Sequence, residues 1–232
     1  MLAFWEKIIL PLLQLYGVKK IVEVGAENGW NTAHLLQYCR AANGELFVID
    51  PAPRFDVQEY KRLFHKEFHM LLDYSLEILP HLQPYDCILI DGDHNWYTVY
   101  HELKWVEAMA AQRGSFPLVF LHDTQWPYGR RDMYYFPESI PAAYLHPYAK
   151  KGMQYGRSEL LEFGGANDIL YNALYENGER NGVLTAVEDF LKQTPWPVTF
   201  LQAHTNSGLG IIVPKNEAVD FHVQTLIAAS GL

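Results

Sequence analysis

The stretch VEVGAENGW, residues 22–30, is the part of the sequence that decides the fold. A short apolar strand runs directly into Gly25, and a second glycine, Gly29, stands where a helix is expected to begin. Open α/β sheets hold nucleotide-like ligands on such a turn, because glycine lets the backbone approach closely and the helix start presents free N–H groups. The stretch therefore predicts a Rossmann-like α/β fold with a ligand above the turn.

The turn departs from the dinucleotide fingerprint G-x-G-x-x-G in an informative way. Glu27 and Trp30 occupy the places of its second and third glycines, and Glu27 would put a negative charge where phosphates would sit. Glu23, two residues before Gly25, would also repel phosphate but suits a cationic ligand. We therefore expect S-adenosylmethionine, which has a sulfonium and an α-amino group and no phosphate, rather than NAD.

Apolar and amphipathic segments alternate along the chain, which is typical of a mostly parallel sheet with helices on both faces. The predicted strands are 20–24, 45–50, 68–72, 85–91 and 117–123, and an antiparallel closing pair at 198–203 and 209–214. The predicted helices are 31–41, 57–67, a short one from Ser75, 96–111 and 182–193, after an N-terminal helical segment, 1–18, interrupted at Pro11. At 232 residues, we expect a single domain spanning 1–232.

An aromatic insert follows the fifth predicted strand, over about residues 125–180. It has no clean period, but eight of the fifteen tyrosines fall between Tyr128 and Tyr175, which indicates an ordered segment. Connections of this length are usually functional or disordered. We interpret the insert as a lid over the substrate pocket, with a packing extension of the sheet as the alternative.

The composition narrows the partners. A net charge of −9 argues against nucleic acid, which needs clustered Lys and Arg, and no apolar run is long enough to span a bilayer. Cys39 and Cys87 do not form a disulfide framework, so we expect reduced thiols and a cytoplasmic location. The expected partner is a small-molecule acceptor, and homo-oligomerisation is left open.

Polar residues follow the predicted strands where ligands of parallel sheets bind. Asp50 follows the second strand at a spacing from Gly25 that suits a ribose contact, although an aspartate there also serves as a turn former. The fourth strand ends in IDGDH, residues 90–94, and the fifth ends in His122 and Asp123. Because neighbouring strands lie about 4.8 Å apart, Asp91 and Asp123 are expected to converge on one ion or substrate.

Four stretches together carry a resemblance to a known family: VEVGAENGWNT, LFVIDP, YDCILIDGDHNWYTVYHEL and FLHDT. Their order and spacing resemble those of class I S-adenosylmethionine-dependent methyltransferases over about residues 20–125. The DGDH motif, followed by an aromatic residue and a helix, is similar to the small-molecule O-methyltransferases that act on macrolide sugars and rhamnosyl groups. That group also includes cephalosporin-hydroxylase-like proteins.

The resemblance implies roles for the residues at the strand ends. The methionine part of the cofactor would be lined by Glu23, Gly25, Ala26 and Gly29. Asp50 would bind the ribose hydroxyls, and Asp91 would lie beside the cofactor. Asp73 and Ser75, after the third strand, would lie near the adenine.

The resemblance also implies a reaction centre. In metal-dependent members an aspartate matching Asp91 and an acidic pair that ends the fifth strand bind magnesium, and a histidine matching His94 acts as the base. In this sequence the pair is His122 and Asp123, so an imidazole replaces one carboxylate. Imidazole suits manganese, iron or zinc better than magnesium, and His122 is alternatively not a ligand at all. The expected metal ligands are thus Asp91, His122 and Asp123, and the expected catalytic residues are His94, Asp91 and His122.

These observations favour methyl transfer from S-adenosylmethionine to a hydroxyl of a sugar or natural product, with a divalent metal as an optional cofactor. A metal-dependent hydroxylase or other oxidoreductase on the same scaffold is the main alternative, because His122 beside Asp123 suits iron. A binding module that has lost catalysis is the third hypothesis.

Overall fold

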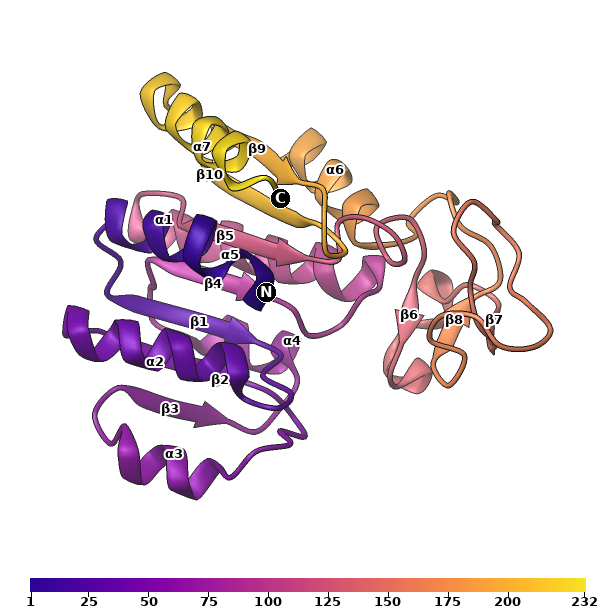
Figure 1. Cartoon of the computed structure of the whole chain (residues 1–232), viewed down its shortest axis with the longest axis horizontal. Coiled ribbons are helices and arrows are strands. Elements are labelled where there is room, and N and C mark those ends of the chain that lie inside the picture. Colours follow the sequence, from indigo (N-terminus) through magenta and orange to yellow (C-terminus); the bar gives the residue numbers. More distant parts are fainter.

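The computed structural model describes residues 1–232 and contains a seven-stranded sheet in the order β3-β2-β1-β4-β5-β10-β9, with helices on both faces (Figure 1). The strands are β1 (Lys20–Val24), β2 (Glu45–Ile49), β3 (Phe68–Leu71), β4 (Cys87–Ile90), β5 (Leu118–His122), β9 (Val198–Ala203) and β10 (Leu209–Pro214). The helices are α1 (Leu10–Leu15), α2 (Trp30–Ala42), α3 (Val57–Leu63), α4 (Ser75–Ile78), α5 (Trp96–Arg113), α6 (Val183–Gln193) and α7 (Glu217–Ser230). This confirms the predicted fold class.

The strands β1 to β5 are all parallel, and β10 runs antiparallel to both β5 and β9. Val24 of β1 pairs with Ile49 of β2 and with Ile90 of β4, so the carboxyl ends of these neighbouring strands lie at one edge of the sheet. The predicted closing antiparallel pair, 198–203 and 209–214, is confirmed with the same bounds. The shared edge is where a parallel sheet places its ligand.

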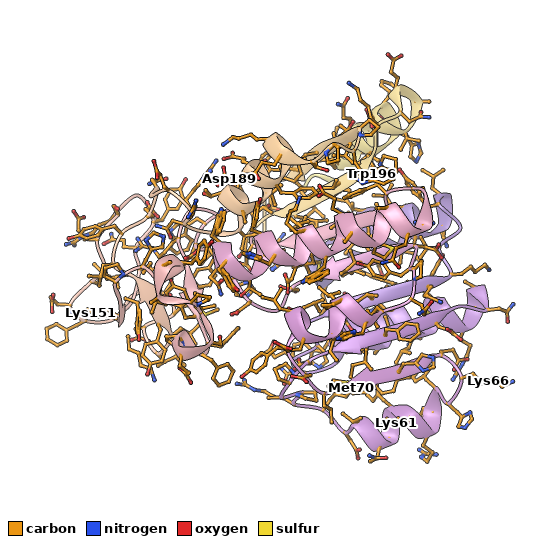
Figure 2. All side chains as sticks on the ribbon, turned by 180° about the vertical axis from the view of Figure 1, so that it is seen from behind. Lys61, Lys66, Met70, Lys151, Asp189 and Trp196 are labelled. Carbon is orange, nitrogen blue, oxygen red and sulfur yellow. The ribbon has the colours of Figure 1, made fainter.

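Two hydrophobic cores cover the two faces of the sheet, because successive strand residues point to opposite faces. Leu12 of the N-terminal segment and Leu35 of α2 pack with Ile21 and Leu46 on one face. On the other face, Val99 of α5 joins a second core that also holds α6. Figure 2, seen from behind, shows α5 lying across the second face, with α6 and Asp189 beside it. Strands buried on both faces read as continuous apolar runs, as β4 does.

Local sequence explains where the helices begin and end. Asn95 caps α5 by accepting a hydrogen bond from the Thr98 N–H at 2.8 Å, and Gly114 ends that helix with a φ of +79°. The N-terminal segment is helical from Leu2 to Leu15, with a π-helical turn at Trp5–Ile9 before Pro11 restarts regular α-helix. None of the helices is long and apolar enough to cross a membrane.

The structure shortens some of the predicted elements and adds a C-terminal helix. The helix expected at 57–67 ends at Leu63, because residues 64–67 turn the chain back toward β3. The strand predicted as 85–91 is regular only over Cys87–Ile90. The C-terminal helix α7 was not predicted; Asn216 caps it by accepting hydrogen bonds from Ala218 and Val219 N–H groups. It packs beside β9, so its apolar side chains have a partner.

The aromatic insert forms a second, three-stranded sheet beyond the carboxyl ends of the main strands (Figure 1). Its strands are β6 (Met133–Tyr134), β7 (Tyr148–Lys150) and β8 (Tyr171–Ala173), in the order β6-β8-β7. A small core of Tyr128, Met133, Met153 and Leu160 holds it together. The insert is therefore ordered and lies on the ligand side of the sheet.

Candidate active site

The sheet order arranges the polar strand ends in one row. From one side to the other, the residues that follow the strands are Asp73 after β3, Asp50 after β2, Gly25 after β1, Asp91 after β4, and the pair His122 and Asp123 at the end of β5. Backbone hydrogen bonds continue between these ends, for example from the Gly25 N–H to the Ile49 carbonyl at 2.9 Å. The structure thus brings the residues predicted from the sequence to a single edge.

The two glycines of the turn are required by the protein's own packing. Gly25 has a φ of +84°, and a Cβ atom there would lie 2.3 Å from the carbonyl oxygen of Asp91. Gly29 has a φ of +75°, and its Cβ would meet the ring of Phe55 at 2.8 Å. Side chains rarely adopt this backbone region, and neither position has room for one. The glycine turn is therefore packed directly against the loop that follows β4.

Asp50 ties the glycine turn to the end of β2. Its Oδ2 atom accepts hydrogen bonds from the Ala26 and Glu27 N–H groups at 2.9 and 3.0 Å, and its Oδ1 accepts one from Ala52 at 2.8 Å. A carboxylate offers about four acceptor positions, so three are already used by backbone amides. Asp50 fixes the turn, and one acceptor position of Oδ1 is left unused by these bonds.

Glu23 is buried beneath the turn and joins β1 to α2. Its two oxygens accept hydrogen bonds from Asn31 Nδ2 and Thr32 Oγ1, both at 2.7 Å. Burial raises the pKa of Glu23 to about 7, although the bonds from Thr32 and Asn31 oppose the rise. A cation bound above the turn would favour the charged carboxylate.

Beyond β3, the predicted pair Asp73 and Ser75 separates into two environments. Asp73 is exposed and accepts a hydrogen bond from the Tyr74 N–H at 2.8 Å. Ser75 is buried, and its hydroxyl donates to Glu102 Oε1 of α5 at 2.5 Å. The Oε2 atom of Glu102 is buried with no hydrogen-bond partner. Burial raises the pKa of Glu102 to about 8, so this carboxyl holds a proton at neutral pH.

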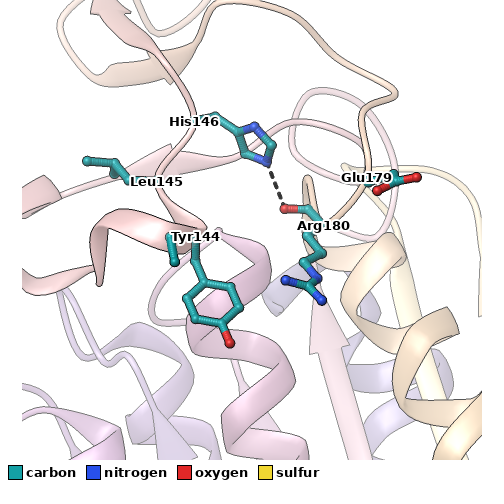
Figure 3. Close-up of a pocket in the computed structure, with 6 residues that line it drawn as sticks. Tyr144, Leu145, His146, Glu179 and Arg180 are labelled. Carbon is teal, nitrogen blue, oxygen red and sulfur yellow. Dashed lines mark hydrogen bonds between the residues drawn. The ribbon is translucent and has the colours of Figure 1, made fainter.

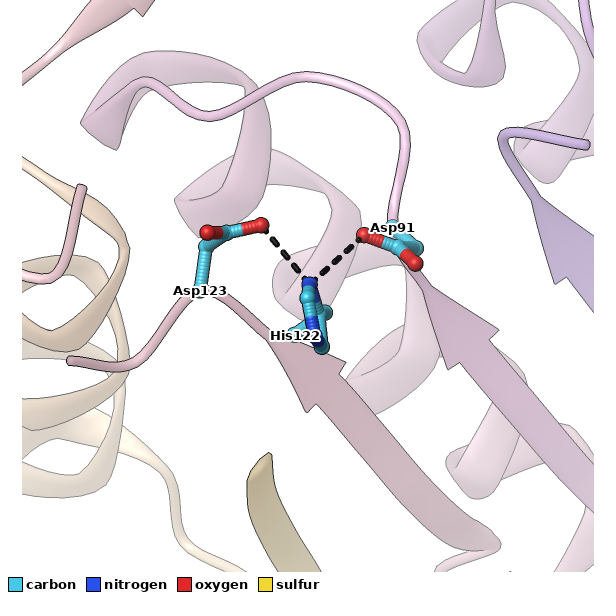
Figure 4. A group of neighbouring side chains, drawn as sticks. All are labelled: Asp91, His122 and Asp123. Atoms are coloured by element: carbon cyan, nitrogen blue, oxygen red, sulfur yellow. Dashed lines mark hydrogen bonds and ion pairs between the residues drawn. The ribbon is translucent and has the colours of Figure 1, made fainter. Parts of the chain in front are cut away.

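Asp91, His122 and Asp123 form the central cluster (Figure 4). The Nδ1 atom of His122 lies 2.8 Å from Asp123 Oδ2 and 3.2 Å from Asp91 Oδ1. One ligand atom from each of the three residues lies within 4.8 Å of the others. The Met1 amino nitrogen lies 3.5 Å from the second oxygen of Asp91. Asp123 has a φ of +58°, a strained value that directs its carboxylate back toward His122.

His122 and Asp91 stabilise each other's charged forms. Burial alone would lower the pKa of His122, but the adjacent charges and hydrogen bonds of Asp91 and Asp123 raise it to about 10. Burial would likewise raise the pKa of Asp91, but the positive charge of His122 and its hydrogen bond lower it to about 2. His122 is therefore an imidazolium between two carboxylates at neutral pH.

His94 lies at the side of this cluster. Its Nδ1 is 3.6 Å from Asp123 Oδ2, and its ring stacks parallel to Tyr128 with the centroids 5.4 Å apart. Its carbonyl accepts a hydrogen bond from the Met133 N–H of β6 at 3.1 Å. The predicted base is thus adjacent to the predicted metal ligands and in contact with the insert.

The sequence reasoning missed two residues of the insert. Tyr135 follows β6 and its ring centroid lies 6.1 Å from that of His94. Asp132 is fully buried and accepts hydrogen bonds from the N–H groups of Trp96 and Gly182, both at 2.7 Å. The tyrosine-rich composition marked the segment as ordered, but no local pattern indicated which of its residues return to the sheet.

Two cavities lie at the junction of the insert with α5 and α6, with volumes of about 450 and 350 Å³. They share Tyr144 and Arg180, and His146 Nε2 lies 3.0 Å from the Arg180 carbonyl oxygen across the larger one (Figure 3). None of the site residues predicted from the sequence lines either cavity. The strand-end site is therefore separate from these openings.

Residues 22–124 match a family model described as "Methyltransferase domain", and none of the curated proteins matches the sequence significantly. Solved structures share the fold. The S-adenosylhomocysteine-bound methyltransferase PaMTH1 of Podospora anserina is 14% identical, with a TM-score of 0.53 over 90% of this chain and 76% of that one. A Staphylococcus aureus candidate caffeoyl-CoA O-methyltransferase is 13% identical, with a TM-score of 0.50 over 89% of this chain and 81% of that one.

A candidate O-methyltransferase from Nostoc punctiforme is 16% identical and also gives a TM-score of 0.50, over 93% of this chain but only 57% of that one. At these identities the likeness shows the fold. Residues 22–124 are thus similar in sequence to a methyltransferase domain, and the chain shares the fold of these structures.

Proposed function

We propose that this protein transfers a methyl group from S-adenosylmethionine to a hydroxyl of a small molecule, such as a sugar or another natural product. The observation that carries the proposal is the row of strand ends. It sets the glycine turn directly beside the cluster of Asp91, His122 and Asp123, with His94 at its side. A cofactor above the turn would present its methyl group toward that cluster.

The cofactor would be held by the residues of the turn and its neighbours. Gly25, Ala26 and Gly29 would line its methionine part above the buried Glu23. The free position of Asp50 Oδ1 would accept from a ribose hydroxyl, and the β3–α4 turn would adjoin the adenine. Because six carboxylates stand near the turn and the cluster, a sulfonium would be favoured there over a phosphate. They are Glu23, Glu27, Asp50, Asp91, Asp93 and Asp123.

The reaction is an in-line displacement in which the acceptor oxygen attacks the methyl carbon and the thioether leaves. Alignment of oxygen, methyl and sulfur is the main task of such an enzyme and can supply ~7–11 kcal/mol. The acceptor hydroxyl must also lose its proton. His94 is the residue best placed to take it, because His122 already carries a proton that Asp91 and Asp123 stabilise.

A divalent metal fits the central cluster. Neighbouring ligand atoms around an ion bound at ~2.1 Å are themselves ~3 Å apart, and the His122 nitrogen lies 2.8 and 3.2 Å from the two carboxylate oxygens. Asp91, His122 and Asp123 would hold the ion after His122 lost its proton, and imidazole favours manganese, iron or zinc over magnesium. The bound ion would stabilise the negative charge of a deprotonated acceptor.

Titration calorimetry of the purified protein with S-adenosylmethionine, S-adenosylhomocysteine and NAD tests the cofactor assignment. We expect the first two to bind and NAD to bind at least a hundredfold more weakly, because its phosphates would face the acidic turn. Tight NAD binding without any response to S-adenosylmethionine would contradict the proposed function.

A metal-dependent hydroxylase on the same scaffold is the second candidate. The imidazole in the donor set favours it, since histidine and carboxylate ligands with open positions support iron chemistry. Metal analysis of protein purified without chelator separates the two functions. Stoichiometric iron with substrate-dependent oxygen uptake would favour the hydroxylase, and methyl transfer without oxygen uptake would exclude it.

A further inference from the structure

Tyr135 belongs to the insert but is held at the reaction centre by the backbone. It directly follows β6, whose Met133 N–H donates to the carbonyl of His94 at 3.1 Å. Asp132, the residue just before β6, is buried. It accepts hydrogen bonds from the N–H groups of Trp96, the first residue of α5, and of Gly182. Because Asp132 and Met133 hold the chain just before Tyr135, the position of Tyr135 beside the loop after β4 is set by the fold.

The Tyr135 ring lies beside His94, with the centroids 6.1 Å apart, at the edge where the carboxylates of the site are gathered. Partial burial raises the pKa of the phenol, and four negative charges within electrostatic reach raise it further. These charges belong to Asp93, Asp91, Glu27 and Asp123. Glu27 lies on the glycine turn and the other three follow β4 and β5, so the phenol is within electrostatic reach of both the turn and the central cluster. The phenol stays protonated, which makes it a hydrogen-bond donor and not a base.

The ring itself is available to a ligand. Tyr135 remains 46% exposed, its ring is tilted by 55° to that of His94, and the other stacking partner of His94 is Tyr128. Aromatic faces of this kind pack against planar rings or against the C–H face of a sugar. The exposed ring of Tyr135 therefore offers a surface beside the nitrogen that would receive the acceptor's proton.

Carboxylates outnumber cations at this end of the site, and the cations are already paired. His122 lies between Asp91 and Asp123, and the Met1 amino nitrogen lies 3.5 Å from Asp91. On the glycine turn, Arg54 lies 3.8 Å from Glu27. Because these cations are held by carboxylates, a carboxylate or phosphate on the acceptor would meet like charges at short range.

We propose that Tyr135 is the acceptor-binding residue of this site and that the acceptor is a neutral or cationic ring-bearing alcohol or phenol, so that carboxylated, phosphorylated and coenzyme A-linked acceptors are rejected. This inference rests on the proposed function and adds the substrate class to it. The ring of Tyr135 packs on the acceptor, its hydroxyl donates a hydrogen bond to it, and the surrounding carboxylates select against anions.

Two matched series of probes test the charge selection by binding. Catechol, dopamine and 3,4-dihydroxybenzoate share one ring and differ in charge, as do glucose, glucosamine and glucuronate. Each is titrated calorimetrically into protein saturated with S-adenosylhomocysteine at pH 7. We expect the neutral or cationic member of at least one series to bind at least tenfold more tightly than the anion. An anion that binds as tightly as its neutral partner, or a failure of all six probes to bind, would overturn the inference.

Variants of Tyr135 test the residue itself. Tyr135→Ala should weaken binding of the preferred probe at least tenfold, and Tyr135→Phe should weaken it by a smaller factor because the ring is kept. Tyr155→Ala, which removes another exposed tyrosine of the insert, serves as the matched control and should change nothing. Affinity for S-adenosylhomocysteine should stay within about twofold in all three variants, which shows that they are folded.

Unchanged probe affinity in Tyr135→Ala would overturn the role of this residue. Different results would contradict the proposed function and the role of Tyr135. A parent protein that does not bind S-adenosylhomocysteine contradicts the proposed function. A protein that binds it but prefers anionic acceptors contradicts only the inference drawn here from Tyr135 and the carboxylates.

Discussion

His94 is the residue on which the proposed chemistry depends most directly. It combines a nitrogen 3.6 Å from Asp123 with a ring fixed by the stack on Tyr128. His122, the other imidazole at this edge, is held as a cation by Asp91 and Asp123 and cannot take up a proton at neutral pH. The two histidines therefore have different tasks, and the structure allows them to be separated by mutation.

Replacement of His94 by alanine is expected to reduce the methyl-transfer rate by roughly 10²–10⁴-fold, the usual contribution of a general base. Affinity for S-adenosylmethionine should barely change, because His94 faces the acceptor side. Single-turnover kinetics with the preferred probe measures the rate, and calorimetry measures the affinity. His65→Ala, at an exposed position after α3, is the control. Full activity in the His94 variant would mean that alignment alone drives the reaction.

In the structure Asp50 holds the glycine turn together, a task beyond the ribose contact predicted for it from the sequence. Because its carboxylate accepts three backbone N–H groups, Asp50→Ala should loosen the glycine turn as well as remove the ribose acceptor. Loss of charge-assisted hydrogen bonds costs about 1.5–3 kcal/mol, so affinity for S-adenosylmethionine should fall about ten- to a hundredfold. Calorimetry of the folded variant checks this value. Unchanged affinity would leave Asp50 as a turn residue without a ligand.

At the scale of elements, the sequence predicted the parts with strong periodicity and missed those held by distant contacts. The strand ends could be predicted because β1, β2, β4 and β5 are mostly apolar and each ends at a glycine or a polar residue. The short strands of the insert could not, because two or three residues carry no period. Helix α7 was not predicted either, because its apolar residues pack against β9, a contact that the local sequence does not indicate.

The same limit applies within the site. Asp91 and Asp123 were predicted to converge because parallel strands bring their ends together, and the structure places both on His122. Tyr135 approaches His94 only through the pairing of Met133 with the loop after β4, which no local pattern encodes. The lid interpretation of the insert stays a prediction, and Asp132 is the residue through which the attachment of the insert to the sheet can be tested.

Asp132→Ala is expected to detach the insert from the sheet. It would leave three buried donors without an acceptor, the N–H groups of Trp96 and Gly182 and the Tyr134 hydroxyl. At ~1–3 kcal/mol each, stability should fall by ~3–9 kcal/mol. Asp132→Asn retains one oxygen and should cost less, and Asp168→Ala, on the surface of the insert, should cost almost nothing. Urea unfolding measures the change, and limited proteolysis should cut the insert first in the alanine variant. Equal protection in all three proteins would show that Asp132 does not anchor it.

At the scale of the whole molecule, several buried carboxyls hold protons more tightly in the folded state than in the unfolded chain. Burial raises the pKa of Glu23 to about 7, of Asp132 to about 6 and of Glu102 to about 8. Each contributes stability that is fully present below its unfolded pKa and is lost as the pH rises through its folded pKa. His122 has the same sign at higher pH, so the molecule as a whole should be more stable in mild acid than in mild alkali.

Of these three carboxyls, Glu102 should contribute to this pH dependence over the widest pH range, from its unfolded pKa of ~4.3 to its folded pKa of about 8. Between pH 5.5 and 7.5 it should remove up to ~1.4 kcal/mol of stability per pH unit, because the unfolded chain releases a proton that the folded protein keeps. The side chain in Glu102→Gln is neutral at every pH and can still accept the bond from Ser75. From pH 5.5 to pH 7.5, the parent should therefore lose ~2–3 kcal/mol more of its stability than this variant does. Urea unfolding at both pH values measures the difference, with the exposed Glu159→Gln as the control that should follow the parent. Parallel curves for the parent and Glu102→Gln would show that Glu102 is already ionised in the folded protein.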